Sequence, residues 1–270
     1  MEVWLRQKLP GYSWNSERQV LFIPMTTGTD VHAANDRALQ VLALLAQRHQ
    51  PMSAPELMAA TGLAKSTLYR QLSLLRRWGL VMEEGGRYGP GPASIELASG
   101  FDAQSRLVQA ARQELQALSR LSAESVALVA VVQERVLCLE MVDSLQSLRC
   151  SFDKGRSVPL RDGASAKCLL AHLPEAQREA ALNRLGEAAA GRERRRQALD
   201  QIRQAGYAVT AGEVDAGVWG VSAPLIDAQR RLQGAITLMA PIFRVEGRES
   251  AFVHMTLVTA ARISRSLQPL

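Results

Sequence analysis

Apolar residues recur at helical spacing in three segments near the start of the chain, over residues 35–47, 55–60 and 63–78. The second segment begins after Ser53, and Glu56 stands three residues later, which is the spacing of a capping box. In the third segment the leucines share one stripe, and the opposite arc of the helix is polar and basic. The pattern therefore predicts three short helices that pack around one small core.

A short hairpin is predicted directly after the third helix. Residues 80–82 and 87–88 read as strands, and the adjacent Gly85 and Gly86 supply the positive φ angles of a tight turn. Three helices followed by a hairpin predict a winged helix-turn-helix unit. The run Gly-Pro-Gly-Pro over 89–92 breaks regular structure, and a helix of roughly 101–121 is expected to follow.

The second half of the chain mixes strands and helices. The apolar runs predict strands over residues 125–132, 136–142, 148–152, 220–226 and 232–239. Helical spacing predicts helices over 163–172, 175–185, 192–205 and 248–267. This order lacks the strict alternation of a doubly wound sheet, so a mixed α/β domain is expected.

The predicted fold class is α+β, with two domains joined by a helix. Such a division suits 270 residues, because single domains commonly have roughly 100–200. The expected boundaries are a flexible N-terminal extension over 1–34, a winged helix-turn-helix domain over 35–92, a linker helix over 93–122 and a larger domain over 123–270.

Charge along the chain points to a polyanionic partner. The net charge is +6, and the window 57–82 contains Lys65, Arg70, Arg76 and Arg77 but no acidic residue. A helix that reads double-stranded DNA needs short polar side chains near its start and cations that hold phosphates. A solvated helix face is the alternative interpretation. The capped helix before it and the hairpin after it favour DNA.

The candidate DNA contacts come mainly from the third helix. Arg70 suits a bidentate contact to guanine, and Lys65, Ser66 and Thr67 suit backbone contacts. Arg87 on the hairpin and Arg37 on the first helix are weaker candidates, which a solvated position would explain equally well. The full set of expected DNA contacts is Arg37, Lys65, Ser66, Thr67, Tyr69, Arg70, Ser73 and Arg87.

Other classes of function receive little support. Cys138, Cys150 and Cys168 lack metal-ligand spacing, and their odd number argues against a disulfide framework, so a reducing cytoplasmic location is expected without a metal or cofactor. No stretch reaches the ~18 apolar residues of a membrane span. Ser165 and Lys167 stand two residues apart, so on a helix their side chains do not share a face and form a poor nucleophile and base pair. We therefore expect that the protein is not an enzyme. Cys168 is expected to pack in a core rather than to sense redox state.

The chain resembles the IclR family of bacterial transcription regulators from about residue 35 to its end. The resemblance rests on motifs that follow one another in order and spacing: Arg37-Ala38-Leu39, Leu42, the run from Thr61 to Leu72, Trp78-Gly79-Leu80-Val81, Tyr88 to Gly91, Pro159-Leu160 to Ala171, Ile202-Arg203, Gly206-Tyr207, Glu213, Gly217-Val218, Ala223-Pro224 and Asp227. Each motif is weakly specific, whereas their order over more than half of the chain is strongly so.

The resemblance implies a GAF-like effector-binding domain, a small-molecule effector that often carries a carboxylate, and assembly into homodimers or homotetramers. It places the effector against the start of the helix at Ser165, where free N–H groups favour an anion. The implied effector-binding residues are Val158, Ala164, Ser165, Ala166, Thr210, Val218, Gly220, Thr237 and Met239.

This sequence departs from the family pattern at three of those positions. Ala166 replaces the usual glycine, Gly220 replaces a common cysteine, and Met239 replaces a frequent polar residue. We therefore expect fewer polar partners, a more apolar wall and a ligand that is bulkier or more hydrophobic than a two- or three-carbon acid, with an aromatic carboxylate as one option; core packing is the alternative interpretation of each of these positions. A DNA-binding or adaptor protein that needs no ligand remains the alternative, and neither repression nor activation follows from the residues.

Overall fold

The N-terminal part of the computed structural model is a three-helix unit with a small antiparallel sheet. The structure describes residues 36–48 and 50–268, so the extension expected over 1–34 lies outside the described residues. The sheet has the strand order β1-β3-β2. The elements are α2 (Asp36–Gln47), β1 (Met52–Ser53), α3 (Ala54–Thr61), α4 (Lys65–Arg77), β2 (Val81–Glu84) and β3 (Arg87–Pro90).

Local signals explain how these elements begin and end. The backbone N–H of Ser53 donates to Oε2 of Glu56 at 2.7 Å, and the backbone N–H of Glu56 donates to Oγ of Ser53 at 3.4 Å, which confirms the capping box. Gly62 ends α3 in the left-handed region with φ +69°. Only the two-residue strand β1, too short to show a pattern, was not expected.

The connection between the two parts is a broken helix. The prediction of one helix over 101–121 is wrong, because α5 (Ala93–Gln104) and α6 (Arg106–Ser122) meet at Ser105. Ser105 has an extended ψ of 105°, and its Oγ accepts a hydrogen bond from the backbone N–H of Val108 at 3.3 Å, so it caps α6. None of the residues of α5 is buried, whereas α6 buries one face.

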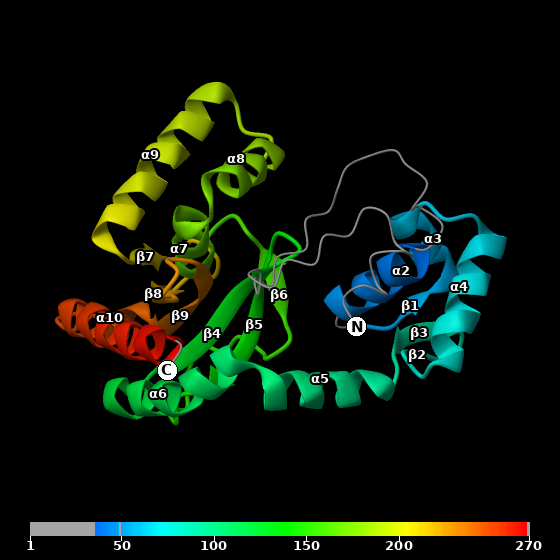
Figure 1. Ribbon diagram of the computed structural model, residues 1–270, viewed down its shortest axis with the longest axis horizontal. Helices are drawn as coiled ribbons and strands as arrows, with labels where there is room; N and C mark the ends of the chain where they lie inside the picture. The colour runs from blue at the N-terminus through cyan, green and yellow to red at the C-terminus, as the bar shows by residue number, and fades with distance from the viewer. Residues whose placement is uncertain (1–35, 49, 269–270) are drawn as a thin grey trace, which may run out of the picture.

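The C-terminal part is a six-stranded antiparallel sheet with helices on both faces (Figure 1). The strand order is β6-β5-β4-β9-β8-β7. Helices α6 and α10 cover one face, and α7 covers the other with α8 and α9 outside it. The elements are β4 (Ser125–Val132), β5 (Arg135–Val142), β6 (Ser157–Pro159), α7 (Ala164–His172), α8 (Glu175–Arg184), α9 (Ala189–Ala205), β7 (Ala208–Ala211), β8 (Val218–Ile226), β9 (Leu232–Pro241), a 3-10 turn (Ile242–Arg244) and α10 (Glu249–Ser266).

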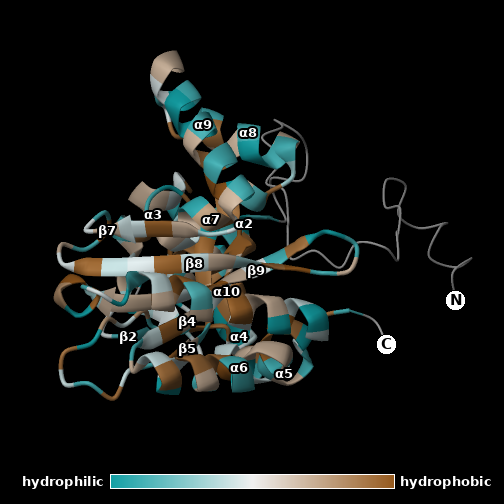
Figure 2. Cartoon of the chain, turned by 90° about the vertical axis from the view of Figure 1, so that its left-hand side faces the viewer, coloured by the Kyte–Doolittle hydropathy of each residue, from teal (hydrophilic) through white to brown (hydrophobic). Residues whose placement is uncertain are grey.

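Each face of the sheet has its own apolar core. Trp219 packs against Phe252 of α10 on one face, with 6.0 Å between ring centroids. Cys168 and Leu169 of α7 are fully buried on the other. In Figure 2, β8 and β9 are drawn largely in brown and white, whereas α8 and α9 carry many hydrophilic residues. Alternation along the strands thus separates two cores.

The strand expected over residues 148–152 is wrong, because this segment is a loop. The third strand of that region is β6, which pairs with β5 over Arg135 to Leu137. Further along the same edge, the backbone N–H of Gly155 donates to the carbonyl of Cys138 at 2.8 Å. The edge of β5 is therefore already occupied, and residues 148–152 have no strand to pair with.

Candidate functional site

The outer arc of α4 carries the polar residues that the sequence singled out. Five of the six α4 candidates are exposed and Thr67 is half-buried, while Leu68, Leu72 and Leu75 are buried. The exposed candidates are Lys65, Ser66, Tyr69, Arg70 and Ser73. Their common direction follows from the helical period, which turns the leucine stripe inward.

The cations of α4 differ in how far they are engaged. Arg76 is paired with Glu83 of β2 at 2.5 Å. Lys65, Arg70 and Arg77 form no salt bridge within the part of the chain that the structure describes. Three cations on one exposed helix are therefore available to phosphates. Arg77 is an additional candidate for DNA contact that the sequence-based list did not include.

The other two candidates for DNA contact are placed less favourably. Arg87 donates through Nε to the carbonyl of Pro51 at 2.9 Å, and its Nη2 lies 3.1 Å from Oε2 of Glu56. Arg37 is half-buried in the first turn of α2. The tip of the wing carries Glu83 and Glu84, whose charge opposes phosphates. The strongest DNA candidates are thus on α4.

A cavity of about 200 Å³ lies between the start of α7 and the sheet, and all nine expected effector-binding residues line it. These are Val158, Ala164, Ser165, Ala166, Thr210, Val218, Gly220, Thr237 and Met239. Further lining residues, not selected from the sequence, are Val136, Cys150, Ser151, Phe152, Arg156, Asp162, Gly163, Glu213, Val214 and Asp215. Among these, Asp162, Gly163 and Glu213 belong to motifs of the family resemblance.

Strand register brings the expected residues together. Gly220 is paired with Thr210 on one side and with Met239 on the other, so the three form a row across the sheet. A Cβ on Gly220 would lie 3.6 Å from Cβ of Ala164, which shows how closely α7 begins above this row. The spacing of these residues along the chain does not reveal this row, because antiparallel pairing alone aligns them.

A chain of hydroxyl groups leads from the cavity into the sheet. Oγ of Ser165 lies 2.8 Å from Oγ1 of Thr237, which donates to Oγ of Ser222 at 3.0 Å. Ser222 in turn donates to the carbonyl of Ile236 at 3.1 Å. Since each hydroxyl has one proton, Ser165 is the donor to Thr237 and offers only lone pairs to the cavity. An anion in the cavity would therefore meet backbone N–H groups rather than this hydroxyl.

Glu213 holds the first turn of α7. Its Oε2 accepts the backbone N–H of Gly163 at 3.2 Å, and its Oε1 lies 2.5 Å from Nζ of Lys167. Gly163 has φ +89°, and a Cβ there would lie 2.8 Å from a methyl of Val214. Only glycine fits this position, so the cavity wall is closely packed at the start of α7.

The lining of the cavity includes charged side chains beside the apolar ones. Asp162 is paired with Arg161 at 3.3 Å and Arg195 at 3.6 Å, and Glu213 is paired with Lys167. Arg156 forms no salt bridge with a residue that the structure describes, and its guanidinium lies 6.0 Å from the ring centroid of Phe152. Arg156 is thus the cation of the lining, beside the ring of Phe152, and it shares the lining with the carboxylates of Asp162, Glu213 and Asp215.

The cysteines are arranged for packing. Burial raises the pKa of Cys138 to about 12, and the charge of Glu140 acts in the same direction. Burial likewise raises the pKa of Cys168 to about 12. Neither thiol is reactive near neutral pH, in accord with the expectation that Cys168 packs in a core.

No group of three His, Cys, Asp or Glu side chains in 36–48 and 50–268 is arranged to hold a metal ion. None of the helices in this part of the chain combines the length and hydropathy needed to span a bilayer.

Two family models match the chain. The model described as bacterial transcriptional regulator IclR C-terminal matches residues 103–265, which is more than half of the chain. The model described as IclR helix-turn-helix domain matches residues 34–85.

Relatives with known names and structures agree with these matches. The HTH-type transcriptional regulator Rv1719 of Mycobacterium tuberculosis is 31% identical over 234 residues, covering 84% of this chain and 89% of its own. The structure of an IclR family transcriptional regulator from Brucella abortus shares the fold with a TM-score of 0.76 at 21% identity, covering 90% and 97% of the two chains. The structure of an IclR homologue from Microbacterium hydrocarbonoxydans does so with a TM-score of 0.69 at 20% identity, covering 87% and 98%.

Proposed function

The chain belongs to the IclR family of bacterial transcription regulators, and from this premise we propose that α4 reads operator DNA under the control of a small carboxylate bound in the α7 cavity. The observation that carries the proposal is the cavity itself. It combines the first turn of α7, whose N-cap glycine offers no side-chain cap, with Arg156, which forms no salt bridge in the described chain, and with apolar wall residues, in about 200 Å³.

The DNA-reading role rests on the exposed arc of α4. Arg70 is assigned to a base edge, because its guanidinium is exposed and unpaired in the described chain. Lys65, Ser66 and Thr67 are assigned to the phosphate backbone at the start of the helix. Tyr69, Ser73 and Arg77 complete the surface, with Arg37 and Arg87 at its edge.

The carboxylate is assigned to the first turn of α7. This helix has no side-chain cap, so its first N–H groups and the positive end of its dipole face the cavity. Arg156 supplies a countercharge, and Phe152 with the neighbouring valines surrounds an apolar body. The Microbacterium hydrocarbonoxydans homologue was solved with 4-hydroxybenzoate, which has this chemistry.

We further propose that the chain works as a homodimer, with α5 at the interface. Ile95 and Leu97 of α5 are 70% and 65% exposed, and Trp78 beside the start of α5 is 67% exposed. Helix-turn-helix regulators commonly bind paired half-sites as two-fold dimers. The relatives are named as regulators, so no reaction is assigned, and the protein acts where the DNA is, in the cytoplasm.

The test is a DNA-binding titration by fluorescence anisotropy. The purified protein is titrated against the intergenic DNA beside its own gene, with and without 4-hydroxybenzoate, and with acetate as an aliphatic comparison. Salt-dependent binding that 4-hydroxybenzoate shifts in a saturable way is expected. Binding that no carboxylate shifts would favour a ligand-independent regulator, and no binding at low salt would contradict the DNA-reading role.

A further inference from the structure

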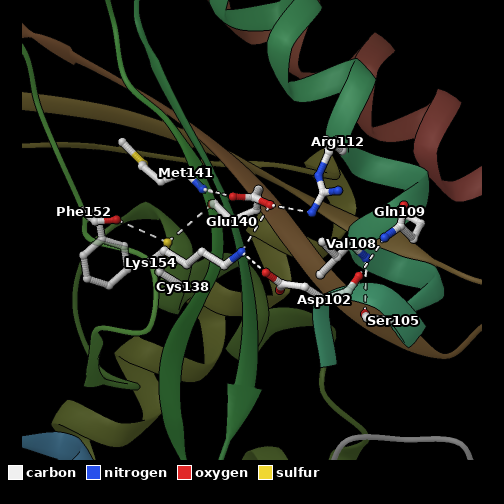
Figure 3. A network of polar contacts seen from close by, with 10 residues as sticks. All are labelled: Asp102, Ser105, Val108, Gln109, Arg112, Cys138, Glu140, Met141, Phe152 and Lys154. Atoms are coloured by element: carbon white, nitrogen blue, oxygen red, sulfur yellow. Dashed lines mark hydrogen bonds and ion pairs between the residues drawn. The ribbon is translucent and has the colours of Figure 1, made fainter. Parts of the chain in front are cut away.

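One turn of the chain contacts both the cavity and the linker. We call residues 152–156 the pocket turn. Phe152 and Arg156, at its two ends, line the cavity. Lys154, between them, extends to the other side of β5 and reaches Asp102 of the linker helix α5 (Figure 3). The turn therefore places one cation midway between two residues that a bound ligand would touch.

The two ends of the pocket turn are bonded to one residue of β5, Cys138. The backbone N–H and carbonyl of Cys138 bond to the carbonyl of Arg156 at 2.9 Å and to the N–H of Gly155 at 2.8 Å. Its thiol, which is neutral, donates to the carbonyl of Phe152 at 3.2 Å (Figure 3). Three hydrogen bonds thus hold Phe152, Gly155 and Arg156 to the same residue, with Lys154 between them.

Lys154 ends on the last turn of α5. Its Nζ lies 2.5 Å from Oδ2 of Asp102 and 3.4 Å from Oε2 of Glu140 (Figure 3). Glu140 is also 3.3 Å from Nη2 of Arg112 on α6. Two cations and two carboxylates thus form one half-buried network that joins the pocket turn, β5, α5 and α6.

A β-bulge directs Glu140 to this network. Val129 is paired with Cys138 and Leu128 with Glu140, so Leu139 is the extra residue on β5. Without the bulge, Glu140 would share the cavity face with Cys138, because side chains alternate along a strand. With it, Glu140 lies on the face covered by α6.

Asp102 stands three residues before the break between the two linker helices. No residue of α5 is buried, although Phe101 packs half-buried against the core of the C-terminal part. Two polar contacts are added at Asp102: the bond from Nε2 of Gln109 to its carbonyl at 2.7 Å, and the ion pair of its carboxylate with Lys154. The ion pair is the contact through which the pocket turn reaches α5.

We propose that Lys154 and Asp102 are positioning residues that transmit the state of the cavity to the DNA-reading helix. Displacement of Phe152 and Arg156 by a ligand rotates the pocket turn, which moves Lys154 and, through Asp102, the end of α5. Control of DNA binding by a ligand rests on the function proposed above. The mechanical link between the pocket turn and α5 is independent of that function, so it is tested first, without ligand.

The first test is amide hydrogen exchange on the full chain. Lys154→Gln is expected to raise exchange of amides 100–104 by about two- to five-fold, the factor that loss of a half-exposed ion pair gives. Lys154→Arg should restore the wild-type rate. The double variant Asp102→Asn with Lys154→Gln should raise the exchange of these amides no further than either single variant does, because both changes remove the same ion pair. The matched control is Arg196→Gln, because the Arg196–Glu179 pair joins α8 and α9 with side-chain exposures of 37% and 31%, against 40% and 29% for Lys154 and Asp102.

The link to the cavity is tested from the cavity side. Phe152→Ala and, as a milder change, Arg156→Gln should alter exchange at amides 100–104 in the wild-type background but not in Lys154→Gln. Thermal melting checks that each variant is folded. The proposal would be overturned if neither cavity variant changed the exchange rate of amides 100–104. It would also be overturned if the cavity variants changed that rate as much in the Lys154→Gln background as in the wild-type background.

The second test measures regulation. The ratio of operator dissociation constants with and without 4-hydroxybenzoate, which for allosteric proteins is typically about 5–150, should fall to within about two-fold of unity in Lys154→Gln. Affinity for 4-hydroxybenzoate, measured by calorimetry, should stay unchanged. A wild-type chain that shows the exchange link but binds no carboxylate would contradict the proposed effector and leave the transmission intact. A Lys154→Gln chain that keeps the full ratio would overturn the transmission.

Discussion

Glu56 and Arg87 are joined by the same carboxylate oxygen that closes the capping box of α3. Oε2 of Glu56 lies 3.1 Å from Nη2 of Arg87, and it accepts bonds from the backbone N–H and Oγ of Ser53 at 2.7 Å and 2.8 Å. The wing is thereby tied to the helix that precedes the DNA-reading helix. Arg87 therefore points to Glu56, and a phosphate would have to share or replace this partner.

The first prediction concerns Glu56 and pH. The bonds from the backbone and side chain of Ser53, with the charge of Arg87, lower the pKa of Glu56 below its ordinary value of 4.5. A carboxylate with a lowered pKa stabilises the fold above its unfolded pKa, and this contribution is lost as pH falls through the folded value. Glu56→Gln should therefore melt at a lower temperature than wild type at pH 7, and the difference should disappear well below pH 4.5. A difference that stays constant with pH would contradict this account.

The second prediction concerns Arg70. Its replacement by alanine should weaken binding to the cognate operator by about 1–3 kcal/mol, or roughly 5- to 150-fold, because a bidentate base contact is lost. Arg194→Ala is the control, since Arg194 is an exposed arginine on α9, far from α4 (Figure 1). Anisotropy titrations at one salt concentration compare the two. Equal affinities for both variants would remove Arg70 from the interface.

The third prediction concerns the charge of Arg156 in the cavity. Arg156→Gln should weaken 4-hydroxybenzoate binding by at least roughly ten-fold, since a hydrogen bond to a charged group is worth about 1.5–3 kcal/mol. The control is Arg149→Gln, which removes an exposed arginine of the loop after β5 that does not line the cavity. This variant should bind 4-hydroxybenzoate with wild-type affinity. Calorimetry measures both. A loss of the same size in Arg149→Gln would show a general charge effect rather than a contact.

The fourth prediction concerns the exposed face of α5. Leu97→Glu should convert a dimer to a monomer in light scattering and weaken binding to a two-half-site operator more than to a single half-site. Leu121→Glu is the matched control, because Leu121 is 72% exposed on α6. A monomeric wild-type chain, or a dimer that survives Leu97→Glu, would place the interface elsewhere.

The helix-turn-helix part was predictable because its signals are local. The capping box of Ser53 and Glu56 and the leucine stripe of α4 join residues within a few positions of one another. The exposed arc that contains Arg70 follows directly from that stripe. The engagement of Arg87 by Glu56 was not predictable, because the two residues lie 31 positions apart.

The cavity was predictable only in part. Family resemblance indicated the residues around Ser165, Gly220 and Met239, and the strand register brings them together. Phe152 was expected in a strand, and no motif of the sequence marked Arg156. Both lie in the cavity wall because Cys138 has already bonded the pocket turn to the edge of β5.

The sequence by itself determined where most helices and strands form, the polar arc of α4 and the family to which the chain belongs. Caps, glycine turns and periodic apolar residues act over a few neighbours and leave a readable pattern. Tertiary structure alone decided the break at Ser105, the bulge that turns Glu140 toward α6, and the contact between Lys154 and Asp102. These features depend on which distant segments pack together. The free energy that stabilises this packing comes from many contacts across the whole sheet, so no single sequence position reveals it.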